Sequence, residues 1–309
     1  MIYFKEIIIY IFFMLKFDLH MHSTFSDGEK TPEELVRMAV DNGITTLAIT
    51  DHDIVEGICI AAAEAKKHLI EIIPGVEVNC VHNTMRMEIL GYFIDPANRK
   101  LNERLAQMRE YREKRADQMI EKLKGINFDI SRDRVAEISG TGTIGRPHIA
   151  RALLEKGYVS SIGEAFRKYL SDNGPCYVSR MKIEAADAIA LIRNAGGIPV
   201  HSHPGFYKTN DLRQHMIELK KLGLMGVEVF YPYPFQVPLF RNNGEKVSGA
   251  DYERYLLSIA RELEFVVTGG TDYHGGGNYS LTITRISADY EYIEKLKETH
   301  QQVSASPTI

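Results

Sequence analysis

The sequence of 309 residues contains few cysteines, no apolar run of membrane-spanning length and no strong excess of either charge. Its three cysteines, Cys59, Cys80 and Cys176, form no C-x-x-C pair. They therefore support neither a disulfide framework nor a thiolate zinc site, and they fit a reducing cytoplasm best. A membrane span needs about 20 consecutive apolar residues, which no run supplies. The net charge of −4 excludes a strongly basic nucleic-acid coat and leaves room for a local positive patch around a small anionic substrate.

Common catalytic loops are also missing. The chain has no Walker phosphate loop and no G-x-S-x-G elbow for an acyl-transfer serine. Residues 140–145 satisfy the pattern G-x-G-x-x-G, but the dinucleotide fingerprint requires a strand before the glycines, and residues 132–138 have helical spacing. We therefore interpret this segment as part of a helical region and not as a dinucleotide site.

The first 13 residues form an apolar N-terminal extension. Its run Ile7–Phe13 is too short to span a membrane, and no small-residue cleavage site follows before the first expected strand. We expect translation to start at Met14, with an extra strand or an interfacial helix as the alternative. The intact mass of the native protein distinguishes these possibilities.

Apolar runs of strand length alternate with helical patterns, which predicts an α/β fold. The runs are Leu15–Leu19, Ile44–Ile49, Ile70–Val78, Met87–Phe93, Gly197–Val200, Gly226–Phe230 and Phe265–Val267. Thr31-Pro32-Glu33-Glu34 combines a capping box with proline at the first helical position, so it predicts the start of a helix that ends before Gly43. Glu184–Ala195, followed by two glycines, predicts another helix that leads into a strand.

Strand signals lapse between residues 95 and 180. Apolar residues such as Leu101, Leu105 and Met108 recur there at helical spacing, and further helix starts follow at Arg146-Pro147 and at the capping box Ser161–Glu164. The sequence thus predicts a helical insertion subdomain over 95–180. The α/β domain itself is expected over 14–94 and 181–290, with a C-terminal tail over 291–309.

Histidine and acidic residues stand in pairs just past the first and last expected strands. His20 and His22 are two residues apart on an extended segment, so their rings point to the same face with Cα atoms about 7 Å apart. Asp272 and His274 repeat this spacing after the last strand. A parallel barrel would bring the last strand beside the first, so these two pairs are predicted to share one site.

More candidates follow or end the strands in between, namely Asp51-His52, Glu77 and His201-Ser202-His203. The carboxyl ends of strands in such a barrel converge on one mouth. Collecting many ionisable groups there costs too much unless a cation compensates them. Imidazole and carboxylate ligands without thiolates suit manganese, iron or zinc, and their number exceeds what one tetrahedral zinc needs, which predicts more than one ion.

These motifs resemble those of the polymerase and histidinol phosphatase (PHP) family. The similar segments are Asp18–Ser23, Thr50–His52, Pro74–Glu77, His203–Gly205 and Asp272–His274. The chain looks most similar to stand-alone metal-dependent phosphoesterases with a helical insertion, whose insertion motif is resembled by Gly145–Arg151. Those members act on nucleotide substrates such as nucleoside 3′,5′-bisphosphates, and some trim short RNA.

The resemblance implies a distorted (β/α)7 TIM-like barrel that holds two or three divalent ions of manganese, iron or zinc. Matching motifs imply one ion held by His20, His22, Glu77 and Asp272, a second served by Asp27, His52 and His274, and a third held by Glu77, His203 and Glu88. Position 88 departs from the family, which usually has histidine there. A second departure, in the substrate-contact region, is Tyr231–Phe235, where relatives are often richer in histidine and serine.

The expected activity is hydrolysis of a nucleotide phosphomonoester by a metal-activated hydroxide. Asp272, His274 and His203 are the candidate catalytic residues, and either histidine is a candidate for protonating the leaving alcohol. Arg146 and His148 are the candidates for gripping phosphate, because arginine presents a bidentate fork at the start of a helix. Alternatives are a phosphatase for another small phosphomonoester such as histidinol phosphate, an amidohydrolase, and a non-catalytic metal-binding module. Neither a membrane nor an obligate protein partner is expected.

Overall fold

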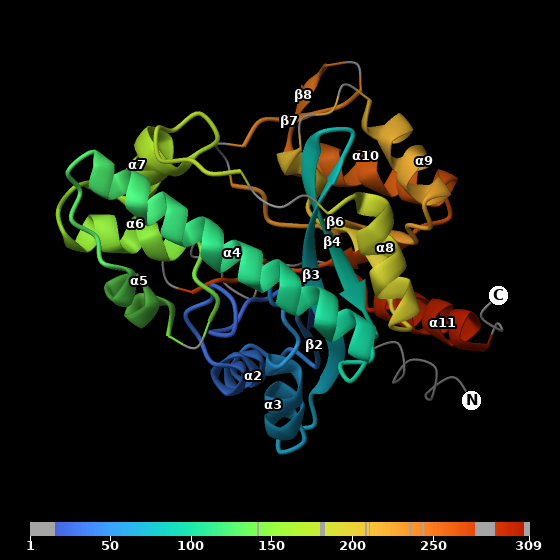
Figure 1. Ribbon diagram of the computed structural model, residues 1–309. Coiled ribbons are helices and arrows are strands. Elements are labelled where there is room, and N and C mark those ends of the chain that lie inside the picture. The colour runs from blue at the N-terminus through green and yellow to red at the C-terminus, as the bar shows by residue number, and fades with distance from the viewer. Residues whose placement is uncertain are drawn as a thin grey trace, which may run out of the picture.

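The computed structural model describes residues 16–140, 142–179, 183–207, 209, 211–234, 237–242, 244–275 and 288–305. The N-terminal extension over residues 1–13, and with it the expected start at Met14, lies outside the described residues. A sheet forms the centre of the molecule (Figure 1). It has seven strands in the order β1-β2-β3-β4-β5-β6-β9. The strands are β1 (Phe17–Asp18), β2 (Thr46–Ile49), β3 (Glu71–His82), β4 (Met85–Tyr92), β5 (Ile198–His201), β6 (Gly226–Phe230) and β9 (Val266–Gly269). Each lies at one of the seven apolar runs of the sequence.

The sheet is parallel except at β4, which runs antiparallel to both β3 and β5. The barrel is therefore mostly parallel, with one reversed strand. The reason is the connection between β3 and β4, which is a tight hairpin. Its residues Asn83 and Thr84 have φ of 48° and 67°, the conformation of a two-residue turn that joins antiparallel strands.

The first and last strands meet and close the barrel. The backbone nitrogen of Leu19 donates to the carbonyl of Gly269 at 3.1 Å, and Met21 forms a parallel bridge with Tyr273. A Cβ atom at Gly270 would lie 2.2 Å from Cβ of His20, so only glycine permits this approach. The predicted neighbourhood of the first and last strands is confirmed.

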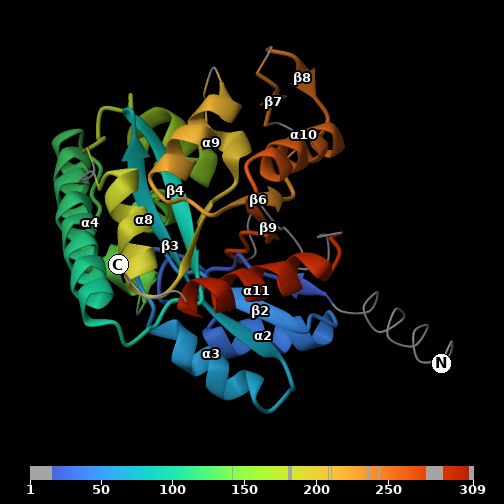
Figure 2. The same ribbon diagram turned by 90° about the vertical axis from the view of Figure 1, so that its right-hand side faces the viewer.

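Helices surround the strands (Figure 2). They are α2 (Pro32–Asp41), α3 (Gly57–Ala65), α8 (Ala185–Asn194), α9 (Leu212–Lys221), α10 (Gly249–Glu262) and α11 (Glu291–Ala305), with a short 3-10 turn η2 (Pro204–Phe206) and a small hairpin of β7 (Leu239–Phe240) and β8 (Lys246–Val247). The capping box predicted for Thr31 and Glu34 is present at the start of α2. Residues 291–305, expected as part of a tail, instead form α11, because Ile293 and Leu296 bury an apolar face in the barrel core.

The helical insertion contains α4 (Arg99–Gly125), α5 (Arg132–Ser139), α6 (Arg146–Glu155) and α7 (Ile162–Ala165), followed by a π-helical turn η1 (Phe166–Leu170). Figure 1 shows α4 running from the barrel to the group of α5, α6 and α7. Leu101 and Leu105, near the start of α4, are buried in the barrel core, whereas Met119 and Leu123 are buried in a separate core of the insertion. One continuous helix thus belongs to both cores.

The glycine-rich segment after α5 follows a helix and not a strand, as expected. This context confirms that the pattern at 140–145 is no dinucleotide fingerprint. None of the helices in the described part of the chain is long and apolar enough to cross a membrane.

Candidate metal centre

Nine side chains proposed as metal ligands gather at one end of the barrel, close to the carboxyl ends of most strands. They are His20, His22 and Asp27 after β1, His52 after β2, Glu77 in β3, Glu88 in β4, His203 after β5, and Asp272 and His274 after β9. Two of them have unusual backbones, because φ is 52° at Asp272 and 21° at His203. Strain of this kind costs about 1–3 kcal/mol per residue and is often found at functional sites.

His20, His22, Glu77 and Asp272 form the first group, the same four that the motifs assign to one ion. The Oδ1 atom of Asp272 lies 3.3 Å from Nε2 of His20 and 3.1 Å from Nε2 of His22. Oε2 of Glu77 lies 3.3 Å from Nε2 of His22. Atoms that each bind one cation at about 2.1 Å stand at such separations from one another, so the geometry suits a shared ion.

The same atoms provide a direct test of whether a cation fits. Nε2 of His20, Nε2 of His22, Oε2 of Glu77 and Oδ1 of Asp272 are buried and have no hydrogen-bond partner among the described residues. Oδ1 of Asp27 is in the same situation. Unsatisfied buried polar atoms are rare because each costs about 1–3 kcal/mol, more if it is charged. Cations bound in the two groups would satisfy these atoms, and the residues present therefore fit a metal centre.

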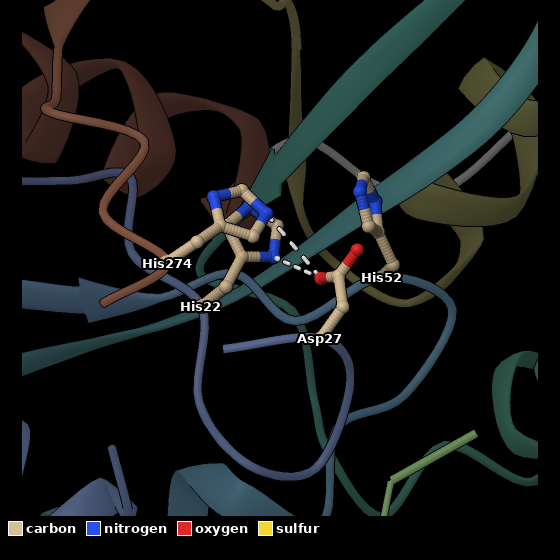
Figure 3. Close-up of side chains that lie close together, drawn as sticks. All are labelled: His22, Asp27, His52 and His274. Carbon is tan, nitrogen blue, oxygen red and sulfur yellow. Dashed lines mark ion pairs between the residues drawn. The ribbon is translucent and has the colours of Figure 1, made fainter. Parts of the chain in front are cut away.

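The second group contains Asp27, His52 and His274 together with His22, whose side chains converge in Figure 3. Oδ1 of Asp27 lies 3.3 Å from Nε2 of His274 and 3.8 Å from Nδ1 of His22. Because Nε2 of His22 faces the first group and Nδ1 faces the second, this ring stands between two cation-sized spaces.

The third group is looser. Nε2 of His203 lies 3.4 Å from Oε1 of Glu77, 3.6 Å from Oε2 of Glu88 and 4.0 Å from Oδ2 of Asp272. The hydroxyl of Tyr207 donates to Glu88 at 3.2 Å and also lies 3.2 Å from Nδ1 of His203. The structure therefore places Glu88 beside His203, its expected partner in the third group. A metal-binding role for Glu88 stays a prediction.

Charges at the centre shift the pKa values of its members strongly. Burial favours the neutral form of Asp272, but His20, His274 and His22 outweigh this effect and hold its pKa well below the usual value. Burial would likewise lower the pKa of His22, but Asp272 and Glu77 raise it to about 10. In the absence of a metal, protons on imidazoles such as His22 thus compensate the carboxylates, whereas burial lowers the pKa of His52 to about 3 and keeps that ring neutral. Bound cations would replace these protons.

Two buried carboxylates lie behind the ligands: Glu228, which was not singled out from the sequence, and Asp51, which was named as a candidate beside His52. Glu228 on β6 lies with Oε1 3.0 Å from Nδ1 of His20, and its Oε2 accepts a hydrogen bond from the backbone nitrogen of His203 at 2.8 Å. Asp51 accepts three hydrogen bonds from Ser23 and Ser26, at 2.5 to 2.7 Å. An acidic residue inside an otherwise apolar strand, as in Gly226–Phe230, is the sequence signal that could have revealed Glu228.

The candidates for phosphate binding lie at the start of α6. Arg146 stacks on Phe166, donates to the carbonyl of Leu170 at 3.3 Å, and lines a cavity of about 190 Å³ together with Asp27 and His52. His148 is buried, and its Nδ1 accepts a hydrogen bond of 3.0 Å from the backbone nitrogen of Gly145. This bond caps the helix. Arg146 thus faces the metal centre, whereas His148 has a structural partner and its phosphate role stays a prediction.

Comparison with known proteins agrees with this geometry. Residues 18–163 match the model of the PHP domain. A 5′-3′ exoribonuclease of Haemophilus influenzae is 32% identical over 261 residues, which cover 84% of this chain and 90% of that protein. A 3′,5′-nucleoside bisphosphate phosphatase of Chromobacterium violaceum is 36% identical over 219 residues, which cover 70% of this chain and 77% of that protein.

The fold is also shared with a solved structure of an amidohydrolase from Chromobacterium violaceum with bound sulfate and no metal. It is 29% identical, gives a TM-score of 0.80, and the match covers 92% of this chain and 96% of that one. The similarity confirms the predicted TIM-like α/β barrel. The matched domain, the relatives and the buried ligand set lead to one conclusion: the chain belongs to the PHP family and is a metal-dependent phosphoesterase.

Proposed function

We propose that this enzyme hydrolyses a phosphomonoester of a nucleotide, such as a nucleoside 3′,5′-bisphosphate or a terminal phosphate of short RNA. The observation that carries the proposal is the set of buried, unsatisfied imidazole and carboxylate atoms beside a cavity lined by Arg146. Two relatives named for nucleotide or RNA substrates support the choice of substrate class.

Two or three divalent ions, manganese, iron or zinc, would be held by the three groups of side chains. When bound, they would supply Lewis acidity and an activated water for attack on phosphorus. The mixture of imidazole and carboxylate donors without thiolates suits these metals. Glu77 belongs to the first group, and its carboxylate also lies 3.0 Å from Nδ1 of His52 in the second group and 3.4 Å from Nε2 of His203 in the third. It would therefore be the ligand shared between ions.

The protein's own side chains would bind and orient the phosphate and move one proton. Arg146, at the edge of the centre, offers a planar fork that can donate two hydrogen bonds to phosphate oxygens. Asp272, His203 and His274 are proposed as the catalytic residues, and the leaving oxygen takes its proton from one of the two imidazoles. His203 is buried and Asp272 is mostly buried, which limits the access of water to their contacts and strengthens their electrostatic effect.

Replacement of Asp272 by asparagine tests the proposal. Phosphate release from adenosine 3′,5′-bisphosphate in the presence of manganese should fall by at least about 100-fold, a loss typical of a group that stabilises transition-state charge. Asp41→Asn, at an exposed position on α2, removes the same charge elsewhere and should leave the rate unchanged. Undiminished turnover by Asp272→Asn would refute the assignment. Histidinol phosphate and an amide substrate, assayed in parallel, should be poor substrates.

A further inference from the structure

A second and larger cavity lies beside the metal centre, between the barrel and the insertion. Its volume is about 580 Å³, within the range of ordinary ligand pockets. The hairpin of β3 and β4 contributes Asn79, Arg86 and Glu88, and the insertion contributes Arg146 and Asp172. Because Asn79 and Arg146 line both cavities, a ligand can extend from the metal centre into this second space.

Two arginines from different parts of the chain meet in this cavity at one carboxylate. Nη1 of Arg86 contacts Oδ1 of Asp172, and Nη1 of Arg146 lies 3.9 Å from the same oxygen. The other terminal nitrogen of Arg86 donates to the hydroxyl of Tyr177, and its guanidinium lies over the Tyr177 ring. Asp172 therefore occupies a position where two guanidinium groups converge.

The ion pairs of Asp172 with the two arginines are weak. The side chain of Asp172 is 54% exposed and that of Arg86 is 40% exposed. An exposed ion pair contributes only about 0–1 kcal/mol, since water screens it. A phosphate group has more charge and more acceptor oxygens than a carboxylate, so it can displace Asp172 and bind both guanidinium groups.

The position of Arg86 connects this site with the metal centre. Arg86 and Glu88 are two residues apart on β4, so their side chains point to the same face and their Cα atoms are about 7 Å apart. Met87, between them, points into the barrel core. A phosphate group bound by Arg86 would therefore lie close to the proposed ligand Glu88, on the face of β4 that lines the second cavity.

We propose that Arg86 and Arg146 form a second anion subsite, which binds a phosphate group of the substrate other than the one that is hydrolysed. Arg146 lines both cavities and stands between the two phosphates, whereas Arg86 lines the second cavity and contacts the second phosphate alone. This inference rests on the proposed function and adds a specificity determinant to it. The subsite gives the enzyme a preference for substrates that carry two phosphate groups. Asp172 holds the two arginines in place until such a substrate binds.

Steady-state kinetics of Arg86→Met test the subsite. With adenosine 3′,5′-bisphosphate the KM should rise about 10- to 100-fold at unchanged kcat, the loss expected for charged hydrogen bonds worth about 1.5–3 kcal/mol. With adenosine 3′-monophosphate or 5′-monophosphate, which lack the second phosphate, the KM should stay the same. Asp172→Asn removes the competing carboxylate and should lower the KM for the bisphosphate. Arg213→Met breaks a comparable exposed pair with Glu262 on a distant helix and should change nothing.

Calorimetric binding of adenosine 3′,5′-bisphosphate to the full-length, EDTA-treated protein separates this inference from the proposed function. Wild type should bind more tightly than Arg86→Met, because the subsite contains no metal ligand. Equal binding by the two proteins, or an equal rise in KM for mono- and bisphosphates, would overturn the subsite. The two proposals can also fail separately. If the wild type hydrolyses no phosphoester but binds the bisphosphate more tightly than Arg86→Met does, the phosphatase function is overturned and the subsite is supported.

Discussion

Glu228 contacts the His20 ring at the nitrogen that does not face the proposed metal site, with its Oε1 atom 3.0 Å from Nδ1 of the imidazole. Its other oxygen accepts a hydrogen bond from the backbone nitrogen of His203 at 2.8 Å, and all three residues are buried. One carboxylate therefore fixes the ring of one proposed ligand and the backbone of another. Carboxylates that orient metal-binding histidines in this way also tune metal affinity.

Replacement of Glu228 by glutamine should weaken metal binding about 10- to 100-fold, because the amide cannot accept both hydrogen bonds with a full negative charge. Titration of the EDTA-treated protein with manganese measures the effect. Glu121→Gln, which breaks an exposed pair with Lys124 on α4, is the matched control and should bind as wild type. Unchanged affinity in Glu228→Gln would show that this carboxylate does not support the centre.

Metal binding should release protons at neutral pH. The pKa of His22 is raised to about 10 and that of His203 to about 9, in both cases because neighbouring carboxylates outweigh the effect of burial. Both rings are thus protonated at pH 7.5 in the metal-free protein, whereas a metal ligand must be neutral. The apparent affinity should therefore rise between pH 6 and about pH 9. Calorimetry in buffers of different ionisation enthalpy counts the released protons, and a count of zero would contradict these protonation states.

Glu88→His should change the metal content of the protein. An imidazole is a softer ligand than a carboxylate, so the substitution should favour zinc over manganese at the site near His203. Elemental analysis after loading with an equimolar mixture of the two metals provides the measurement. Identical stoichiometry and identical phosphatase rates in wild type and variant would mean that position 88 is no ligand.

Leu153 and Leu154 on α6 offer a matched pair for the insertion core. Leu153 is fully buried, whereas Leu154 is 38% exposed. Leu153→Ala should lower the free energy of unfolding by about 2–5 kcal/mol, and Leu154→Ala should change it by no more than about 0.5 kcal/mol. Urea denaturation followed by circular dichroism measures both. Equal effects would show that α6 does not pack as described.

The strands and the pairing of His20 with His22 could be predicted from sequence because they depend on local patterns, whereas the grouping of the ligands came from the resemblance to the PHP family. Apolar runs bounded by turn residues located all seven strands, and the spacing of His20 and His22 was enough to place both rings on one face. Long-range geometry was harder to predict. The reversal of β4 depends on a hairpin without glycine at its turn, Asn83-Thr84, so the usual turn signal was missing.

The supporting residues escaped prediction for a related reason. Glu228 reads as one polar position inside an apolar strand, and its partners His20 and His203 are distant in sequence. The meeting of Arg86 and Arg146 at Asp172 likewise joins the barrel hairpin to the insertion, which no local pattern encodes. Contacts of this kind follow only from the folded arrangement.

Helix α4 spans 27 residues, or about 40 Å, and its two ends are anchored in different hydrophobic cores. Excision of residues 95–180 would strip Leu101 and Leu105 from the barrel and leave apolar strands open to water. An exchange of insertions between relatives should instead be joined within the helix, between the two anchors, at a point that keeps Arg112 and its ion pair with Asp53. A splice there keeps each half of the helix with the core that it stabilises.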